Sequence, residues 1–166
     1  MPTKSAHPEL DTFGRQLLVA LQHDNRTPLR VLAQRVHLST AAVQRRIRRM
    51  EDLGVICANV AVVDPDQVGQ VITLLVEVRA DRTQTADLDA LKVSFSGPEV
   101  QQCYYVTGEG DFMLVLNVRS MSEYETLANR LFHDNPGVKW FRTIVVMGRI
   151  KVGLEVSVSE SSLDGR

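Results

Sequence analysis

The sequence predicts an α+β protein in which a three-helix N-terminal domain is followed by a C-terminal domain with the element order βαββαβ. Apolar residues recur at helical spacing up to Gly54, whereas alternation and β-branched runs dominate afterwards. Asp64-Pro65 separates the two patterns. The 166 residues, 44% of them hydrophobic, suffice for two small domains with packed cores.

The N-terminal elements are marked by their ends. Asp11 can charge or cap the first turn of one helix, and Pro28 suits the first position of a second, short helix because its φ is already fixed. Ser39 is a good N-cap for a third helix over residues 40–53, which Gly54 ends. A short helix, a tight turn and a longer helix together indicate a helix-turn-helix of the winged type.

The C-terminal half alternates strands and helices. The expected elements are, in order, a strand at 71–80, a helix at 84–96, strands at 100–107 and 112–118, a helix through Tyr124 to Phe132, and a strand at 138–147. This is the split βαβ or ferredoxin-like order, which predicts an antiparallel sheet with both helices on one face. The alternating segment 152–158 is either an edge strand of this chain or a strand that pairs with a neighbouring subunit.

Charge is distributed unevenly along the chain. The net charge is −1, which excludes an evenly basic coat, but residues 1–65 carry nine Lys/Arg and six Asp/Glu. The remaining ten Lys/Arg and fourteen Asp/Glu lie in residues 66–166. Four arginines and no acid fall between Thr40 and Arg49. The third helix is therefore the basic feature of the sequence.

On a helical wheel these arginines fall mostly on one side of the third helix. Val43, Ile47 and Met50 lie within about 60° of arc and face inward. Arginine can pair with guanine and glutamine with adenine, while small residues can approach a thymine methyl and helix N-termini meet phosphates. The residues expected to contact DNA are Thr40, Ala41, Gln44, Arg45, Arg48 and Arg49. The alternative is a basic helix that is merely solvated.

Two residues near this helix are expected to have structural roles. Arg46 falls beside the inward face, so it should pair with an acid of the same domain rather than read a base. His37 stands in the turn where glycine is common, and it should adopt a positive φ, which histidine tolerates better than most residues.

The segment Gly108-Glu109-Gly110-Asp111 joins two predicted strands. One interpretation is a hairpin loop that needs positive φ. The other is a pocket for an amino acid, in which N–H groups near Gly108 and Gly110 meet a carboxylate and Asp111 meets the ammonium. Strand register decides whether Tyr104 or Tyr105 faces such a pocket.

The remaining chemistry is sparse. Cys57 and Cys103 are expected to be reduced thiols in apolar settings, which favours the cytoplasm. The four histidines have no metal spacing, and no nucleophile or phosphate-loop motif is present, so neither metal, cofactor nor catalysis is expected. No apolar run is long enough for a membrane span, and residues 1–8 lack the layout of a signal peptide.

The sequence resembles the Lrp/AsnC (feast/famine) family of transcription regulators. The matching stretches are Leu10-Asp11, Leu17-Leu18, Leu38-Ser39, Arg46-Ile47, Gly54-Val55-Ile56, Asp64-Pro65 with Gly69, Val106-Thr107-Gly108 and Asp111-Phe112. They occur in order over residues 9–150. The sequence departs from the family pattern at Gly14, His37 and Ala58-Asn59, none of which lies on the proposed DNA-contacting face.

The resemblance implies a DNA-binding regulator that responds to a small effector, often an amino acid, and forms dimers that associate further, often to octamers. It implies effector contacts at Thr107, Gly108, Gly110, Asp111 and Tyr105, with Tyr104 and Thr143 as weaker candidates. The expected domains are residues 1–56 for DNA binding, 57–69 as linker strand or hinge, 70–158 for ligand binding and oligomerisation, and 159–166 as a loose tail.

Two other functions fit the same scaffold. Some relatives resemble sirohaem decarboxylases, but that chemistry favours basic and histidine residues in the second domain, where His133 stands alone. A sensor that acts only through protein partners would not need the arginine-rich face. We therefore expect a regulator in the cytoplasm, associated with the nucleoid and bound to double-stranded DNA.

Overall fold

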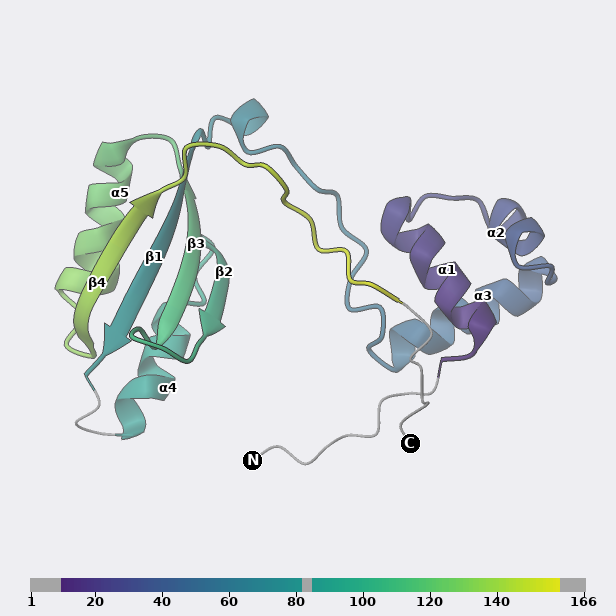
Figure 1. Ribbon diagram of the computed structural model, residues 1–166, viewed down its shortest axis with the longest axis horizontal. Helices are drawn as coiled ribbons and strands as arrows, with labels where there is room; N and C mark the ends of the chain where they lie inside the picture. The colour runs from purple at the N-terminus through teal and green to yellow at the C-terminus, as the bar shows by residue number, and fades with distance from the viewer. Residues whose placement is uncertain (1–9, 82–84, 159–166) are drawn as a thin grey trace. The chain divides into compact units, whose positions relative to one another are not determined.

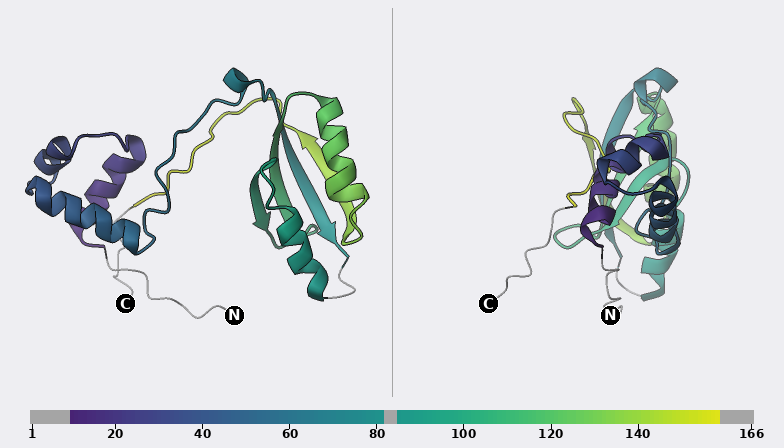
Figure 2. Two further views of the ribbon diagram at one scale, coloured as in Figure 1. Left: turned by 180° about the vertical axis from the view of Figure 1, so that it is seen from behind. Right: turned by 90° about the vertical axis from the view of Figure 1, so that its right-hand side faces the viewer.

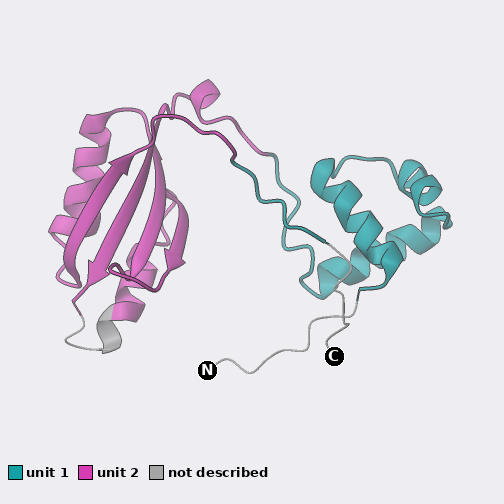
Figure 3. Ribbon diagram, viewed as in Figure 1, with its two compact units in different colours: residues 1–61, 152–166 teal, residues 62–151 magenta. Residues whose placement is uncertain are grey.

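The chain forms two compact units, which Figure 3 distinguishes by colour. The computed structural model describes residues 10–81 and 85–158, apart from the side chains of 85–87. Unit 1 comprises residues 1–61 and 152–166, and unit 2 comprises residues 62–151. Segment 152–158 groups with unit 1 and forms no strand in the single chain. The tail 159–166 lies outside the described residues.

Unit 1 contains the three predicted helices (Figure 1). They are α1 (Thr12–His23), α2 (Leu29–Arg35) and α3 (Thr40–Asp52). Asp11 and Ser39 are N-caps, as predicted, because their side chains accept hydrogen bonds from the amides of Gly14 and Ala42. Pro28 is itself an N-cap residue and not the first helical residue, since its ψ of 141° is not helical. The described residues of unit 1 contain no strand that could form a wing.

The three helices share one apolar core. Its fully or nearly fully buried members are Leu17, Leu18, Leu32, Ala33, Val36, Val43 and Met50. Two backbone positions with positive φ shape the turns around it: His37 at 53° between α2 and α3, and Gly54 at 69° after α3. Both were expected from the sequence. The turn at His37 sets the direction in which α3 leaves α2.

Unit 2 is a four-stranded antiparallel sheet with the strand order β2-β3-β1-β4. The strands are β1 (Ile72–Ala80), β2 (Val100–Tyr105), β3 (Phe112–Val118) and β4 (Val138–Val145). The helices are α4 (Thr85–Ser94) and α5 (Met121–Ala128), and the latter continues as a π-helical turn, Asn129–His133. Order and pairing are those of the predicted ferredoxin-like fold.

Both helices lie over the same face of the sheet, as the view from behind in Figure 2 shows. Alternation along the strands directs Leu74, Val76 and Val78 of β1 into the core beneath them, where each is fully buried. The π turn after α5 places the consecutive residues Leu131 and Phe132 in this core. The helix layer and the apolar face of the sheet therefore close one core, as the alternation predicts.

The opposite face of the sheet is partly apolar and remains accessible. The register aligns Val115, Leu75 and Ile144 in one row across three strands, and Ile144 is 40% exposed. In the next row Glu77 pairs with Arg142 at 2.6 Å, and Glu77 is only 8% exposed. The described residues of unit 2 thus leave one face of the sheet uncovered.

Both cysteines are free, as predicted, but the prediction of apolar settings was wrong. Cys57 and Cys103 are exposed, because Cys57 follows α3 on an extended connector and Cys103 lies on the edge strand β2. Partial burial nevertheless raises the pKa of the Cys103 thiol above its ordinary value.

The positive φ of His37 generates a stability prediction. A side chain with a β-carbon is strained in this region, whereas glycine is not. His37→Gly should therefore raise the free energy of unfolding by up to about 1 kcal/mol, and His37→Val should lower it by more than about 1 kcal/mol. Urea unfolding followed by circular dichroism measures both changes. A destabilised glycine variant would contradict the strain.

Candidate nucleic-acid interface and effector region

The six residues predicted to contact DNA lie together on the exposed side of α3. Thr40, Ala41, Gln44, Arg45, Arg48 and Arg49 are all exposed. Val43 and Met50 on the opposite side are 0% and 4% exposed. Among the described residues, Arg45, Arg48 and Arg49 make no ion pair. Their guanidinium groups are thus available to an anionic partner.

Arg46 differs from its neighbours, as the sequence predicted. Its Nη1 atom lies 2.6 Å from Oδ2 of Asp11, and its guanidinium carbon lies 5.4 Å from the centre of the Phe13 ring. The Gly14 amide, and then the Arg46 guanidinium, hold the pKa of Asp11 below its ordinary value against the opposing effect of burial. One carboxylate therefore caps α1 and also fixes α3 against it.

The geometry of α3 suits the major groove of DNA. An exposed helix of this width fits the groove, and its exposed arginines and Gln44 carry the donors that read guanine and adenine edges. The N-terminal turn, capped by Ser39, presents backbone N–H groups that can meet phosphate oxygens. The arrangement can therefore both position the helix on a duplex and read its bases.

The effector candidates surround the loop between β2 and β3. Thr107, Gly108 and Glu109 are exposed, and Gly108 has a φ of 135°, which a residue with a side chain rarely adopts. Gly110 is buried, and a β-carbon there would lie 2.6 Å from Cγ of Glu77. Both glycines are thus required by the loop itself, which satisfies the hairpin interpretation. Ligand binding at this loop stays a prediction.

Asp111 is held at the end of the loop by backbone groups. It is 1% exposed, and its Oδ2 accepts a hydrogen bond of 2.9 Å from the backbone N–H of Ala80. Its own N–H donates to the carbonyl of Val78, and its carbonyl accepts from the N–H of Val106. In the single chain, Asp111 anchors the loop to the end of β1.

The strand register resolves which tyrosine lies on which face. Tyr105 is opposite Phe112, with ring centres 5.3 Å apart, on the face that carries the helices. Tyr104 is opposite Met113 on the accessible face, where its hydroxyl donates to Gln102. Thr143, a weaker candidate, faces the helix layer and shares a hydrogen bond with the Tyr124 hydroxyl.

Sequence reasoning missed Glu77, which supports this region from beneath. Its nearly buried side chain in the middle of β1 occupies the space that a β-carbon at Gly110 would need, and its carboxylate pairs with Arg142. The signal was a lone acid within the apolar run of residues 72–78. Its partner could not be named from sequence because the pairing of β1 with β4 was not known.

Two cavities lie elsewhere, and neither includes residues 107–111. One of about 420 Å³ lies between α1 and α2, and one of about 360 Å³ lies near Gln70, Glu99 and Asn117 in unit 2. The described part of the chain brings together no group of three or more His, Cys, Asp or Glu that could hold a metal. No helix there has the length and apolar character needed to cross a bilayer.

A helix-turn-helix with an exposed basic helix, joined to a ferredoxin-like sheet domain, is the architecture of a DNA-binding regulator with a sensory domain. Comparison with known families agrees: residues 10–51 match the AsnC-type helix-turn-helix domain, and residues 73–156 match the Lrp/AsnC ligand binding domain. The chain belongs to the Lrp/AsnC family of transcriptional regulators. The resemblance stated from the sequence is confirmed.

Individual relatives align over most of their length. An uncharacterised HTH-type transcriptional regulator of Sinorhizobium fredii is 41% identical over 151 residues, which cover 90% of this chain and 89% of that protein. An AsnC family regulator from Agrobacterium tumefaciens has a crystal structure with a TM-score of 0.83 and 29% identity, covering 90% and 97% of the two chains. A feast or famine regulatory protein from Mycobacterium tuberculosis, complexed with L-methionine, has a TM-score of 0.80 and 31% identity, covering 89% and 99%.

The double role of Asp11 generates a prediction. Asp11→Ala removes the cap and the ion pair and should lower the free energy of unfolding by about 1–2 kcal/mol. Asp11→Asn keeps a capping oxygen and should cost less than about 1 kcal/mol, because the ion pair is exposed. Urea unfolding at pH 7 compares the two variants.

The same pair gives a pH dependence with a defined sign. Since the pKa of Asp11 is lower in the folded protein, its charge stabilises the fold above the ordinary carboxyl pKa of about 4. This contribution is lost as the pH falls through the folded-state value. The difference between wild type and Asp11→Asn should therefore vanish at low pH, and a difference that grew there would contradict the assignment.

Proposed function

We propose that α3 is the recognition helix of a sequence-specific DNA-binding transcriptional regulator, with base contacts from Gln44, Arg45 and Arg48 and closer approach by Thr40 and Ala41. Arg49 contributes a phosphate contact. The observation that carries this proposal is that the arginines on the outer side of α3 are exposed and make no ion pair among the described residues, whereas Arg46 is held by Asp11. Double-stranded DNA is the partner that offers both phosphates and base edges to such a helix.

The second proposal concerns the effector, which we infer to be an amino acid that binds at the β2–β3 loop. Residues Thr107, Gly108 and Gly110 would meet its carboxylate through backbone N–H groups, and Tyr105 flanks them. The Asp111 Oδ2 atom accepts a hydrogen bond from the Ala80 amide, and a carboxylate accepts several hydrogen bonds, so we propose that Asp111 receives the ligand ammonium alongside its existing partners. The L-methionine bound by the Mycobacterium tuberculosis relative supports this class of ligand.

The assembly that we propose is a homodimer formed through the accessible faces of two sheets, which associates further to an octamer. Joining the faces would cover the aliphatic row of Val115, Leu75 and Ile144. Two recognition helices could then meet a near-palindromic site one duplex turn, about 34 Å, apart. Thr107, Gly108 and Glu109 are exposed in the single chain, and we propose that a neighbouring dimer completes the effector site.

The second candidate function is an enzyme on the same scaffold, and the histidine that would favour it is engaged in packing. His133, the one histidine of the second domain in the sequence, packs against the ring of Phe141. We propose that the protein is cytoplasmic and associates with the nucleoid, since DNA is its proposed partner. We propose no cofactor for it. A purified protein that is coloured or that binds porphyrin would favour the enzymatic alternative.

Genomic footprinting of the purified protein, with and without a panel of amino acids, tests the proposed function as a whole. We expect protected sites whose half-sites lie one duplex turn apart. At least one amino acid should change the protection pattern. The absence of any protected site would overturn the assignment of α3. Protected sites that no amino acid alters would leave DNA binding intact and overturn the effector class.

Arg45→Gln and Arg48→Gln should each weaken binding to a footprinted site by about 1–3 kcal/mol, because each removes a base contact. Arg119→Gln in unit 2, whose arginine pairs with Glu123, is the matched control and should bind like wild type. Gel-shift titration measures the affinities. Unchanged affinity in both α3 variants would refute this contacting face.

Gly108→Val should abolish binding of L-methionine, or of whichever amino acid the panel identifies, because valine both strains the loop and blocks the approach of a carboxylate. Glu109→Gln, an exposed change in the same loop, is the control and should retain binding. Isothermal titration calorimetry measures binding of the amino acid. Gel shifts should show that both variants still bind DNA. Normal ligand binding by the valine variant would exclude the loop as the site.

A further inference from the structure

The chain joins its two units twice. The outgoing connector, residues 55–66, leaves unit 1 after α3, and the return connector, residues 146–158, leads from β4 back to unit 1. Neither connector contains a strand of the sheet, and apolar side chains on both are exposed, as Val62 at 89% and Ile150 at 98% illustrate. The contacts that hold the connectors in place lie near their ends.

At its unit 1 end, the return connector is held by Gln22 of α1. The Gln22 Nε2 atom donates to the carbonyl of Val156 at 3.1 Å, and the N–H of Val156 donates to Gln22 Oε1 at 2.8 Å. One side-chain amide thus satisfies both backbone groups of one residue, as a neighbouring strand would. Two residues later, Val158 packs against the apolar core of unit 1. We call this fastening the Gln22 clamp.

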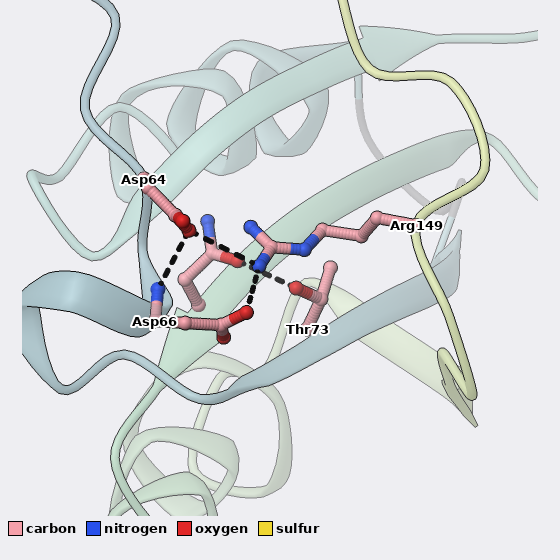
Figure 4. Close-up of polar contacts among 5 residues, drawn as sticks. Asp64, Asp66, Thr73 and Arg149 are labelled. Carbon is pink, nitrogen blue, oxygen red and sulfur yellow. Dashed lines mark hydrogen bonds and ion pairs between the residues drawn. The ribbon is translucent and has the colours of Figure 1, made fainter.

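At its unit 2 end, the return connector is held by Arg149, as Figure 4 shows. The guanidinium lies 2.5 Å from a carboxylate oxygen of Asp66 and 3.4 Å from one of Asp64, both on the outgoing connector. The Arg149 side chain is only 22% exposed. Asp64 also accepts a hydrogen bond from the backbone N–H of Asp66. This Arg149 clasp ties the two connectors to each other where both meet unit 2.

The outgoing connector is fastened in unit 1 as well. The N–H groups of Val55 and Ile56 both donate to the carbonyl of Met50, at 2.8 and 3.1 Å, and both side chains pack against the core. Residues 57–63 then run to the clasp, and residues 150–155 run from the clasp to the clamp. Fully extended, the chain from residue 56 to residue 64 spans at most about 29 Å, and the chain from residue 149 to residue 156 at most about 25 Å. The two tethers are therefore short and similar in length.

A single flexible tether lets a domain swivel freely, whereas two short tethers fastened at both ends do not. We propose that the return connector is a strap that restricts rotation of the helix-turn-helix unit relative to the sheet unit. The strap works only while both the Gln22 clamp and the Arg149 clasp are closed. Rearrangement of unit 2 reaches α3 through this strap as well as through the outgoing connector.

The strap predicts that opening either fastening has the same effect as opening both. In the full-length protein, Gln22→Leu opens the clamp with little change in volume, and Arg149→Gln opens the clasp. His23→Gln beside the clamp and Arg119→Gln away from the clasp are the matched controls. Arg149→Lys retains the charge and should restore part of the restriction.

The exposed native cysteines provide the measurement, because Cys57 lies in unit 1 and Cys103 in unit 2. Both cysteines are labelled with nitroxides, and labelled chains are diluted into unlabelled chains so that each measured pair lies in one chain. Pulsed EPR then reports the distribution of distances between the two labels. Each single variant should broaden this distribution relative to wild type and the controls. The double variant should be no broader than the broader single variant.

Distributions that stay narrow in both single variants, or that broaden additively in the double variant, overturn the strap. The second readout rests on the proposed function: affinity for a footprinted DNA site should fall about 3- to 10-fold in each single variant and no further in the double variant. Additive losses again count against the strap. If wild type binds no DNA, the proposed function fails, and the EPR distributions still decide the inference.

Discussion

The constraint on which the rest of the structure depends is the separation of charge and apolar surface around α3. Helical periodicity turns Val43 and Met50 into the core and leaves Arg45 and Arg48 in solvent. The remaining parts of unit 1 maintain this orientation: Ser39 caps the helix, and the Asp11–Arg46 pair joins α3 to the start of α1. Only the arginine nearest the core is neutralised, so the outer guanidinium groups keep their charge for a partner.

In unit 2, the alternation of side chains along the strands likewise separates a buried face from an accessible one. One face of its sheet closes a core with α4 and α5, and the other keeps an apolar row beside the Glu77–Arg142 pair. A sheet with one uncovered face of this kind is suited to a second copy of itself. The β2–β3 loop is fixed at one end of this sheet by Asp111 and Gly110, so a ligand there would act on an element already tied to β1. The two connectors are the covalent routes from that sheet to the DNA-binding helix.

The sequence predicted what periodicity and local turn chemistry determine. The three helices, the four strands, the caps Asp11 and Ser39, the positive φ of His37 and the confinement of Arg46 all follow from short-range patterns. Contacts between distant segments did not follow. The burial of Asp111 depends on the end of β1, whose Ala80 amide it accepts a hydrogen bond from. The hydrogen bonds between Val156 and Gln22 of α1 join segments that lie 134 residues apart. Such outcomes depend on tertiary partners that a local pattern does not specify.

The central claim is that α3 presents Arg45 and Arg48, but not Arg46, to DNA. The most direct measurement is an NMR titration of the arginine side-chain Nε–Hε signals with a footprinted duplex. The account predicts large shifts for Arg45 and Arg48, a smaller one for Arg49, and an Arg46 signal that stays with its Asp11 partner. Shifts confined to arginines outside α3, or an Arg46 signal that moves while Arg45 and Arg48 do not, would contradict it.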